Sequence, residues 1–141
     1  MGDPKAEAEI ERIERIFADP NFKVEEILEY VDPDDFVSLN LNYNINGKKA
    51  FVEHLHRALA LMPKFTNEIL KLKVYASGDH GFAIALHKTM LYDAQGNLLF
   101  GGHLRNTTCY RKRNGRWYQV SQHASVPFDM RTKAPDLESD W

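Results

Sequence analysis

The sequence lacks most of the features that mark secreted and membrane proteins. Its 141 residues contain one cysteine, Cys109, so no internal disulfide can form. No apolar run approaches the roughly 20 residues that a membrane-spanning helix requires. The N-terminal residues are charged and helix-forming, whereas a signal peptide has an apolar core. These absences predict a cytoplasmic protein with no membrane partner.

An excess of charge of one sign is also missing. Lys and Arg number 18 and Asp and Glu number 20, with both signs interleaved along the chain. A nucleic-acid-binding protein usually carries a basic patch, so this class of partner is not expected. No cluster of Cys, His and carboxylate residues has the spacing of metal ligands. His54 and His56 are two residues apart on a predicted helix, so their side chains point in different directions and do not form a pair of ligands. We expect neither a metal ion nor a cofactor.

Hydrophobic residues make up 43% of the chain, which is enough to form one core. Helical spacing predicts helices at 5–18, 23–30 and 48–62. Between the last two of these helices, Val37, Leu39 and Leu41 alternate with polar residues, which predicts a strand that buries them.

Period-two alternation predicts four more strands, at 66–76, 82–92, 97–111 and 116–125. This order favours an α+β fold, in which a strongly curved antiparallel or mixed sheet wraps over three N-terminal helices. We expect a single domain over residues 1–141, with its core at about 6–128. The tail at 129–141 has no periodicity, so we expect a loosely ordered end, although Phe128 and Trp141 could each dock.

The last two predicted strands form a hairpin around the Asn-Gly turn at 114–115, because Asn-Gly tolerates the positive φ angles of a tight turn. The facing pairs predicted from this turn are Arg111 with Trp117, Thr107 with Ser121, and Arg105 with His123. A neighbouring guanidinium and imidazole could bind a carboxylate, or hold an enolate oxygen while the histidine transfers a proton. The sequence leaves open whether this face lines a pocket or forms the outer surface of the sheet.

Two further histidines belong to the neighbouring strand pair. Pairing across the turn at 93–96 brings His87 close to the Gly101-Gly102 segment and to His103. We expect a β-bulge at the two glycines, which would shift the alternation of side chains along that strand. His87 could therefore share a face with Arg105, or with Asn106 instead.

Four stretches carry a family resemblance, namely LEYVDPDDFVSL, NGKKAFVEHL, RNTTCYRKRNGRWYQV and QHASVPFD. Together they resemble the nuclear transport factor 2-like superfamily, in particular its SnoaL-like and ketosteroid isomerase-like group. The resemblance implies a cone-shaped domain with a pocket between the concave sheet and the helices, and a homodimer formed through the sheet. The general-base aspartate of the ketosteroid isomerases falls at Asn40, whose amide cannot accept a proton at neutral pH. In the kinase association domains the position matching His87 holds a pocket arginine, which favours a cavity position for His87.

The resulting hypothesis is a small cofactor-independent protein that binds an apolar small molecule bearing a carbonyl or carboxylate. It would catalyse isomerisation, dehydration or cyclisation, with His123 as acid and base, Arg105 as the anchor for negative charge, and His87 orienting the ligand. The residues expected to contact the ligand are Asn40, Tyr43, His103, Thr107 and Ser121. The alternative is a non-catalytic ligand-sensing or dimerisation module like the kinase association domains, which the missing aspartate favours.

Overall fold

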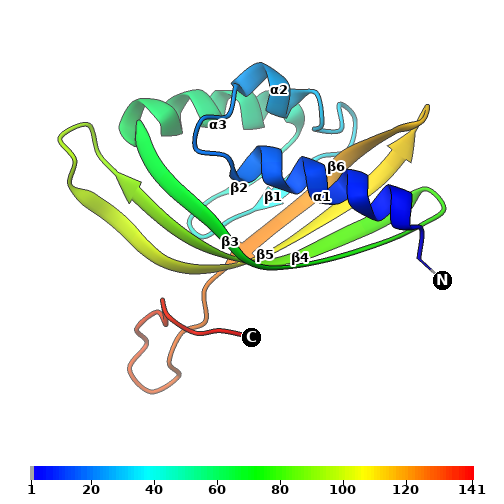
Figure 1. Cartoon of the computed structure of the whole chain (residues 1–141). Coiled ribbons are helices and arrows are strands. Elements are labelled where there is room, and N and C mark those ends of the chain that lie inside the picture. Colours follow the sequence, from blue (N-terminus) through cyan, green and yellow to red (C-terminus); the bar gives the residue numbers. More distant parts are fainter. Residues whose placement is uncertain (1) are drawn as a thin grey trace.

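The computed structural model describes residues 2–141; residue 1, which the predicted domain includes, lies outside the described residues. Within this range three helices cover the concave face of one curved sheet (Figure 1). The helices are α1 (Pro4–Ala18), α2 (Val24–Leu28) and α3 (Lys48–Leu61). The strands are β1 (Val37–Leu39), β2 (Asn44–Asn46), β3 (Lys64–Ser77), β4 (His80–Tyr92), β5 (Leu98–Arg113) and β6 (Arg116–Ser125). The predicted α+β class, with a curved sheet over three helices, is confirmed.

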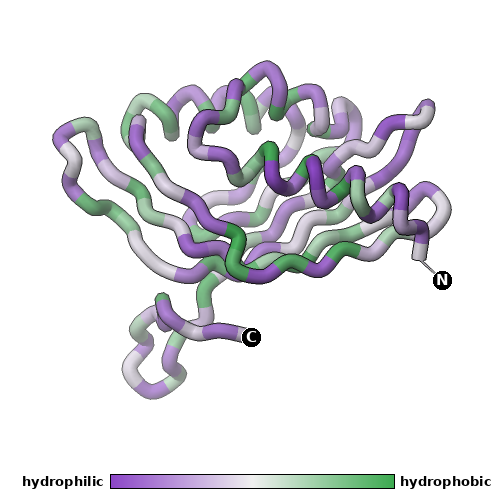
Figure 2. The backbone as a smooth tube through the Cα atoms, viewed as in Figure 1, coloured by the Kyte–Doolittle hydropathy of each residue, from purple (hydrophilic) through white to green (hydrophobic). Residues whose placement is uncertain are grey.

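The sheet has the order β2-β1-β6-β5-β4-β3 and is mixed. β1 runs parallel to β6, and every other neighbouring pair is antiparallel. Hydrophobic and hydrophilic residues alternate along the long strands, as Figure 2 shows, so the two faces of the sheet have different characters. None of the helices in residues 2–141 combines the length and the apolar character that crossing a membrane requires.

Helix α1 covers one half of the concave face. It begins where the Asp3 carboxylate accepts the backbone N–H groups of Lys5 and Ala6, each at 3.1 Å, and Pro4 occupies its first turn. Ile10 and Ile13 of its apolar stripe are fully buried. They belong to a core cluster that also contains Ala6, Ala76, Ala83, Tyr110 and Trp117. A second cluster, under α2 and α3, contains Ile27, Val31, Phe36, Ile45 and Phe51.

Only Val37–Leu39 of the strand predicted to follow the second helix forms a strand, β1, and its buried face was predicted wrongly. Ser38 is fully buried, whereas Val37 and Leu39 keep 37% and 39% of their surface exposed. Ser38 is buried because β1 pairs with β6. It lies opposite Gln122 and donates a hydrogen bond to Oε1 of that residue at 3.3 Å. The inner face of the sheet is polar at this point, so the apolar side chains of β1 face outward.

The predicted β-bulge at Gly101-Gly102 is also absent from the described strands. β4 and β5 pair without interruption from His80 opposite Arg111 to Leu91 opposite Phe100, and the irregularity lies beyond Leu91. Gly102 serves another purpose, since a Cβ atom there would lie 2.6 Å from Cβ of Leu137 in the C-terminal tail. A glycine therefore lets the tail approach β5.

The tail packs against the convex face of the sheet, opposite the helices (Figure 1), which differs from the loosely ordered end expected from the sequence. The backbone N–H of His103 donates to the carbonyl of Leu137 at 2.8 Å. Lys71 on β3 pairs with the Asp140 carboxylate at 2.8 Å and donates to the carbonyl of Trp141 at 2.9 Å. The tail is thus held by contacts to two different strands.

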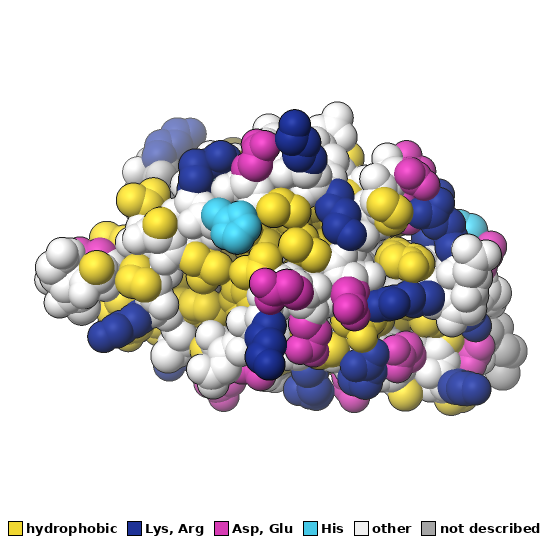
Figure 3. Space-filling model, turned by 90° about the horizontal axis from the view of Figure 1, so that it is seen from above, with side chains coloured by type: hydrophobic (Ala, Val, Ile, Leu, Met, Phe, Trp, Pro, Cys, Tyr) yellow, Lys and Arg dark blue, Asp and Glu magenta, His cyan; other side chains and the backbone are white. Residues whose placement is uncertain are grey.

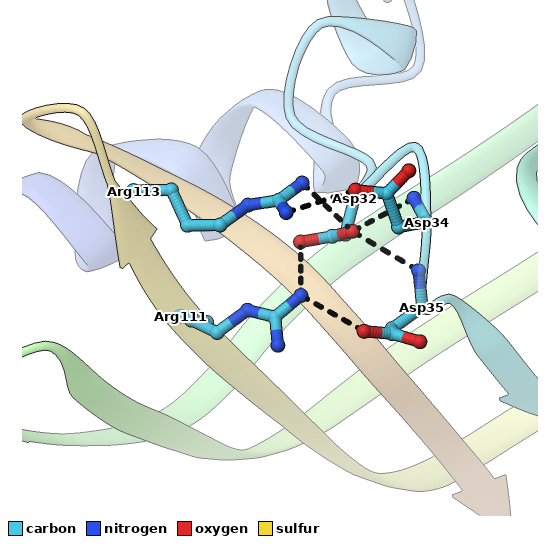
Figure 4. A network of polar contacts seen from close by, with 5 residues as sticks. All are labelled: Asp32, Asp34, Asp35, Arg111 and Arg113. Atoms are coloured by element: carbon cyan, nitrogen blue, oxygen red, sulfur yellow. Dashed lines mark hydrogen bonds and ion pairs between the residues drawn. The ribbon is translucent and has the colours of Figure 1, made fainter.

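A buried carboxylate joins the loop after α2 to the β5–β6 hairpin (Figure 4). Asp32 is fully buried and accepts the backbone N–H groups of Asp34 and Asp35 at 2.9 and 3.0 Å. It also pairs with Arg111 at 3.0 Å and with Arg113 at 3.2 Å. Burial alone would raise the pKa of Asp32, but these hydrogen bonds and the two arginines hold it below its ordinary value.

We predict that Asp32→Asn lowers the free energy of unfolding by roughly 3 kcal/mol, because it leaves two arginines without their buried partner. Asp35→Asn is the matched control, since Asp35 is exposed and pairs with Arg111 alone, so its loss should be below about 1 kcal/mol. Urea unfolding at pH 7 measures both. Because the folded pKa of Asp32 is lowered, its contribution is present above about pH 4 and disappears below it. Equal losses in the two variants would contradict this interpretation.

Candidate functional site

The hairpin β5–β6 has a different register from the one predicted. Thr107 lies opposite His123, and Arg105 lies opposite Ser125. Near the turn the observed pairing differs from the predicted one by one residue, because Trp117 lies opposite Lys112 and not opposite Arg111. An irregularity between Cys109 and Tyr110 shifts the pairing by one more residue. Arg105 and His123 are therefore diagonal neighbours on one face and not a directly facing pair.

Tyr110 identifies which face of β5 is which. Its hydroxyl donates to the carboxylate of Glu14 on α1, so Tyr110 faces the helices. Because β5 pairs regularly with β4, side chains alternate from this point, and Asn106 shares the concave face with Tyr110. Arg105 and its diagonal neighbour His123 therefore face the convex side. Their predicted catalytic roles remain predictions.

A cavity of about 350 Å³ lies between the convex face and the tail. Arg105, Thr107 and His123 are among the residues that line it, together with Trp141. The Nε atom of Arg105 donates to the hydroxyl of Ser125 at 3.2 Å. Three of the residues predicted to form a site are thus brought together, but on the outer surface of the sheet.

His87 lies on the opposite, concave face of β4. It faces Leu104 of β5, and its side chain is buried, with 8% of its surface exposed. Its Nδ1 atom is 3.0 Å from Oδ1 of Asn67, which also accepts the hydroxyl of Thr89 at 3.1 Å. Because an amide oxygen only accepts, Nδ1 carries the ring proton and Nε2 keeps its lone pair. Burial lowers the pKa of His87, so the ring is neutral at pH 7.

Two buried acceptor atoms on this face have no protein partner within residues 2–141. They are Nε2 of His87 and Oδ1 of Asn106. Asn106 lies opposite Ala85, two residues from His87 along β4, so the two side chains are diagonal neighbours. A buried polar atom without a partner costs roughly 1–3 kcal/mol, so each one calls for an explanation, and a catalytic role is one such explanation. These two atoms mark the concave face as the candidate functional site.

The helix side of the molecule offers an apolar surface near this site. Seen from above, hydrophobic side chains gather in the middle of the face, with charged side chains around them (Figure 3). The rings of Phe22 and Phe65 pack against each other at a tilt of 46°, with centroids 5.7 Å apart.

The remaining residues predicted to contact a ligand lie elsewhere. The side-chain amide of Asn40 donates to the hydroxyl of Tyr43 at 2.8 Å, and the Tyr43 ring stacks on His54 with centroids 3.9 Å apart. Burial raises the pKa of Tyr43 to about 12, so its phenol stays protonated. His103 lies under the tail, with Nδ1 3.1 Å from the carbonyl of Ser139. Ser121 lies on the convex face opposite Cys109.

A buried chain of polar side chains, which was not predicted from the sequence, crosses the concave face. Tyr110 donates to Glu14 at 2.5 Å, Gln119 donates to the Tyr110 oxygen at 2.9 Å, and Gln122 donates to Gln119 at 2.6 Å. Burial raises the pKa of Glu14 to about 7, although the hydroxyl of Tyr110 partly opposes this. The burial of Glu14 could have been predicted from its spacing, because position 14 is one helical turn from Ile10 on the apolar stripe of α1. Asn67 and Asn106 carried no comparable local signal.

Comparison with known proteins gives a family match. The family model of the SnoaL-like domain matches residues 11–129. No curated protein sequence matches the chain significantly.

Similar folds are found among solved structures. An NTF2-like protein of unknown function from Pseudomonas putida KT2440 has a TM-score of 0.85 at 24% identity, with 100% of both chains covered. A proposed dehydratase of the NTF2-like family from Streptomyces avermitilis has a TM-score of 0.77 at 14% identity, covering 89% of this chain and 98% of that one. A proposed calcium/calmodulin-dependent protein kinase II association domain from Xanthomonas campestris has a TM-score of 0.66 at 20% identity, covering 86% and 84%. At these identities the likeness establishes the fold alone.

Glu14 gives a prediction about pH. Its folded pKa of about 7 lies above its ordinary value of 4.5, so the folded state holds a proton that the unfolded state releases. The free energy of unfolding should therefore fall as the pH rises from 4.5 to 8, by roughly 3 kcal/mol through this group. Glu14→Gln, which stays neutral, should lack this part of the decline. Urea unfolding of both proteins across this range measures it, and parallel pH profiles would contradict the assignment.

Proposed function

Because this chain belongs to the SnoaL-like domain family, we propose that it binds an apolar carbonyl compound between the concave sheet and the helices, with His87 as general base. The observation that carries the proposal is the free lone pair of His87 Nε2. The neighbouring Asn67 oxygen fixes the ring proton on Nδ1. A neutral, oriented imidazole with an unpartnered nitrogen is a suitable proton acceptor near pH 7.

Asn106 narrows the choice among the possible reactions. Its Oδ1 atom and Nε2 of His87 are both acceptors, so together they suit a substrate that offers a hydroxyl and an acidic C–H. A β-hydroxy carbonyl compound has both groups. Among isomerisation, dehydration and cyclisation, this complementarity favours dehydration. The proposed dehydratase of similar fold agrees with it at the level of the fold.

The step balances without a cofactor. Nε2 of His87 takes a proton from the carbon beside the carbonyl, and the released electron pair forms an enolate. The enolate then forms the C=C bond as the C–O bond of the hydroxyl breaks. The imidazolium returns its proton to the leaving oxygen, so the products are water and a conjugated carbonyl compound. Asn106 holds the hydroxyl until it leaves.

The test uses 4-hydroxy-4-phenylbutan-2-one, an apolar β-hydroxy ketone, and follows the ultraviolet absorbance of its conjugated enone product. We expect turnover by the native protein, and a loss of roughly 100-fold or more in kcat for His87→Gln, whose amide cannot take a proton. His80→Gln is the control, because His80 is an exposed histidine at the first position of β4, seven residues from His87, and should retain full activity. Equal activity of the native protein and His87→Gln would contradict the proposal.

Thermal shift measurements extend the search for a ligand. A panel of ketosteroids, polyketide-like ketones and small carboxylates tests binding separately from turnover, because a ligand at 100 times its Kd stabilises the protein by about 2.7 kcal/mol. If no compound in the panel shifts the melting temperature, a ligand of this class is excluded at the concentrations used.

We also propose that the protein forms a homodimer through the convex face. This dimer would support the alternative function, that of a non-catalytic dimerisation module. Tyr75 and Phe82 stack there with ring centroids 5.0 Å apart, while 48% and 40% of their surfaces stay exposed. Val37 and Leu39 are further exposed apolar residues of this face, on β1 at the other side of β6 and β5. Exposed apolar groups gathered on one face are typical of protein interfaces.

The double variant Tyr75→Ser/Phe82→Ser should weaken this dimer, because it removes the largest exposed apolar groups of the convex face. Sedimentation velocity across a concentration series measures the effect. Leu61→Ser is the control, since Leu61 is an even more exposed apolar residue on α3, away from the convex face. A native protein that stays monomeric throughout the series would rule out the interface.

A further inference from the structure

We propose that the cavity between the convex face and the C-terminal tail is a second binding site, and that it takes a small flat organic carboxylate. This site lies on the other side of the sheet from His87, so the inference does not depend on the proposed dehydration. Its volume of about 350 Å³ falls within the range of small-molecule pockets. The cavity combines an oriented cation, additional donors and an aromatic wall.

Arg105 supplies the cation. Its Nε atom is held by the Ser125 hydroxyl at 3.2 Å, which fixes the plane of the guanidinium group. Within residues 2–141 no carboxylate lies within ion-pair distance of it, whereas Arg111 and Arg113 are both paired. The two terminal nitrogens of Arg105 are therefore available, and their fork geometry matches both oxygens of a carboxylate.

Asp140 is the acidic residue of the cavity lining, and it does not neutralise this cation. Its carboxylate is 2.8 Å from Nζ of Lys71, which binds it from the β3 side. The imidazole of His123 and the hydroxyl of Thr107 line the cavity beside Arg105 and add further hydrogen-bonding groups. The polar side of the cavity thus favours an anion.

The remaining walls favour a flat apolar body. Leu86, which is almost fully buried, and Ile84 form part of the floor, and Trp141 of the tail lies in the lining. Lys71 Nζ lies 5.7 Å from the centroid of the Trp141 ring and donates to the backbone carbonyl of Trp141, so one contact orients the indole and the other holds its backbone. An aromatic ring can pack against this indole while its carboxylate reaches Arg105.

Isothermal titration calorimetry of the full chain with 2-naphthoate at pH 7 tests the site. We expect saturable binding, and an affinity at least about tenfold weaker for the neutral analogue 2-naphthamide, which lacks the charge. Arg105→Gln and Trp141→Ala should each weaken naphthoate binding by about tenfold or more. Lys88→Gln is the matched control, because Lys88 is an exposed cation on the same face outside the cavity lining.

His87→Gln separates this site from the concave one, and it should leave naphthoate binding unchanged. Three results would overturn the proposal: no saturable binding up to about 10 mM naphthoate, equal affinity in Arg105→Gln, or loss of binding in His87→Gln. If Arg105→Gln does not fold, Arg105→Lys replaces it. The lysine variant keeps the charge but not the planar fork, and should still bind more weakly than the native protein.

Discussion

The uninterrupted pairing of β4 with β5 determines where each functional side chain lies. In a regular antiparallel pair, directly opposite residues share a face and successive residues alternate. The hydrogen bond from Tyr110 to Glu14 fixes one residue of β5 on the helix side, and the faces of residues 104–109 follow by alternation. His87 and Asn106 therefore face the helices, whereas Arg105 faces the tail. A shift of one residue in this pairing would exchange the two sets of side chains.

The pairing of β4 with β5 places two different chemical environments on the two faces of one sheet. The concave side holds neutral or buried polar groups, including His87 with its lowered pKa and Glu14 with its raised pKa. The convex side holds the guanidinium of Arg105 and the ion pair between Lys71 and Asp140. Proton transfer suits the first environment, where burial keeps an imidazole neutral. Binding of an anion suits the second.

The sequence predicted the parts of the fold that depend on local patterns. Helices with a clear apolar stripe and strands with regular alternation were found within a few residues of their observed ends. The faces of the strands were harder to predict, because they depend on pairing between distant segments. Ser38 is buried since it meets Gln122, and Val37 is exposed for the same reason, although its alternation predicted the opposite.

The candidate site could be predicted only in part, because the faces of its residues also depend on strand pairing. His87 was considered for the cavity, but its face depended on a bulge that the strands do not contain. Arg105 and His123 were placed on a common face correctly, while the irregularity beside Cys109 changed which residues stand opposite each other. Asn106 was noticed only as a possible neighbour of His87. Its unpartnered oxygen becomes visible only when the burial of both side chains is known.

The protonation state of His87 is the central claim, and nitrogen-15 NMR of the histidine rings measures it directly. At pH 7 we expect a neutral His87 ring that carries its proton on Nδ1, with Nε2 showing the chemical shift of an unprotonated nitrogen. Replacing Asn67 with alanine should remove the preference for this tautomer, since its oxygen holds the proton on Nδ1. A His87 ring that is protonated on Nε2, or that carries two protons at pH 7, would contradict the account.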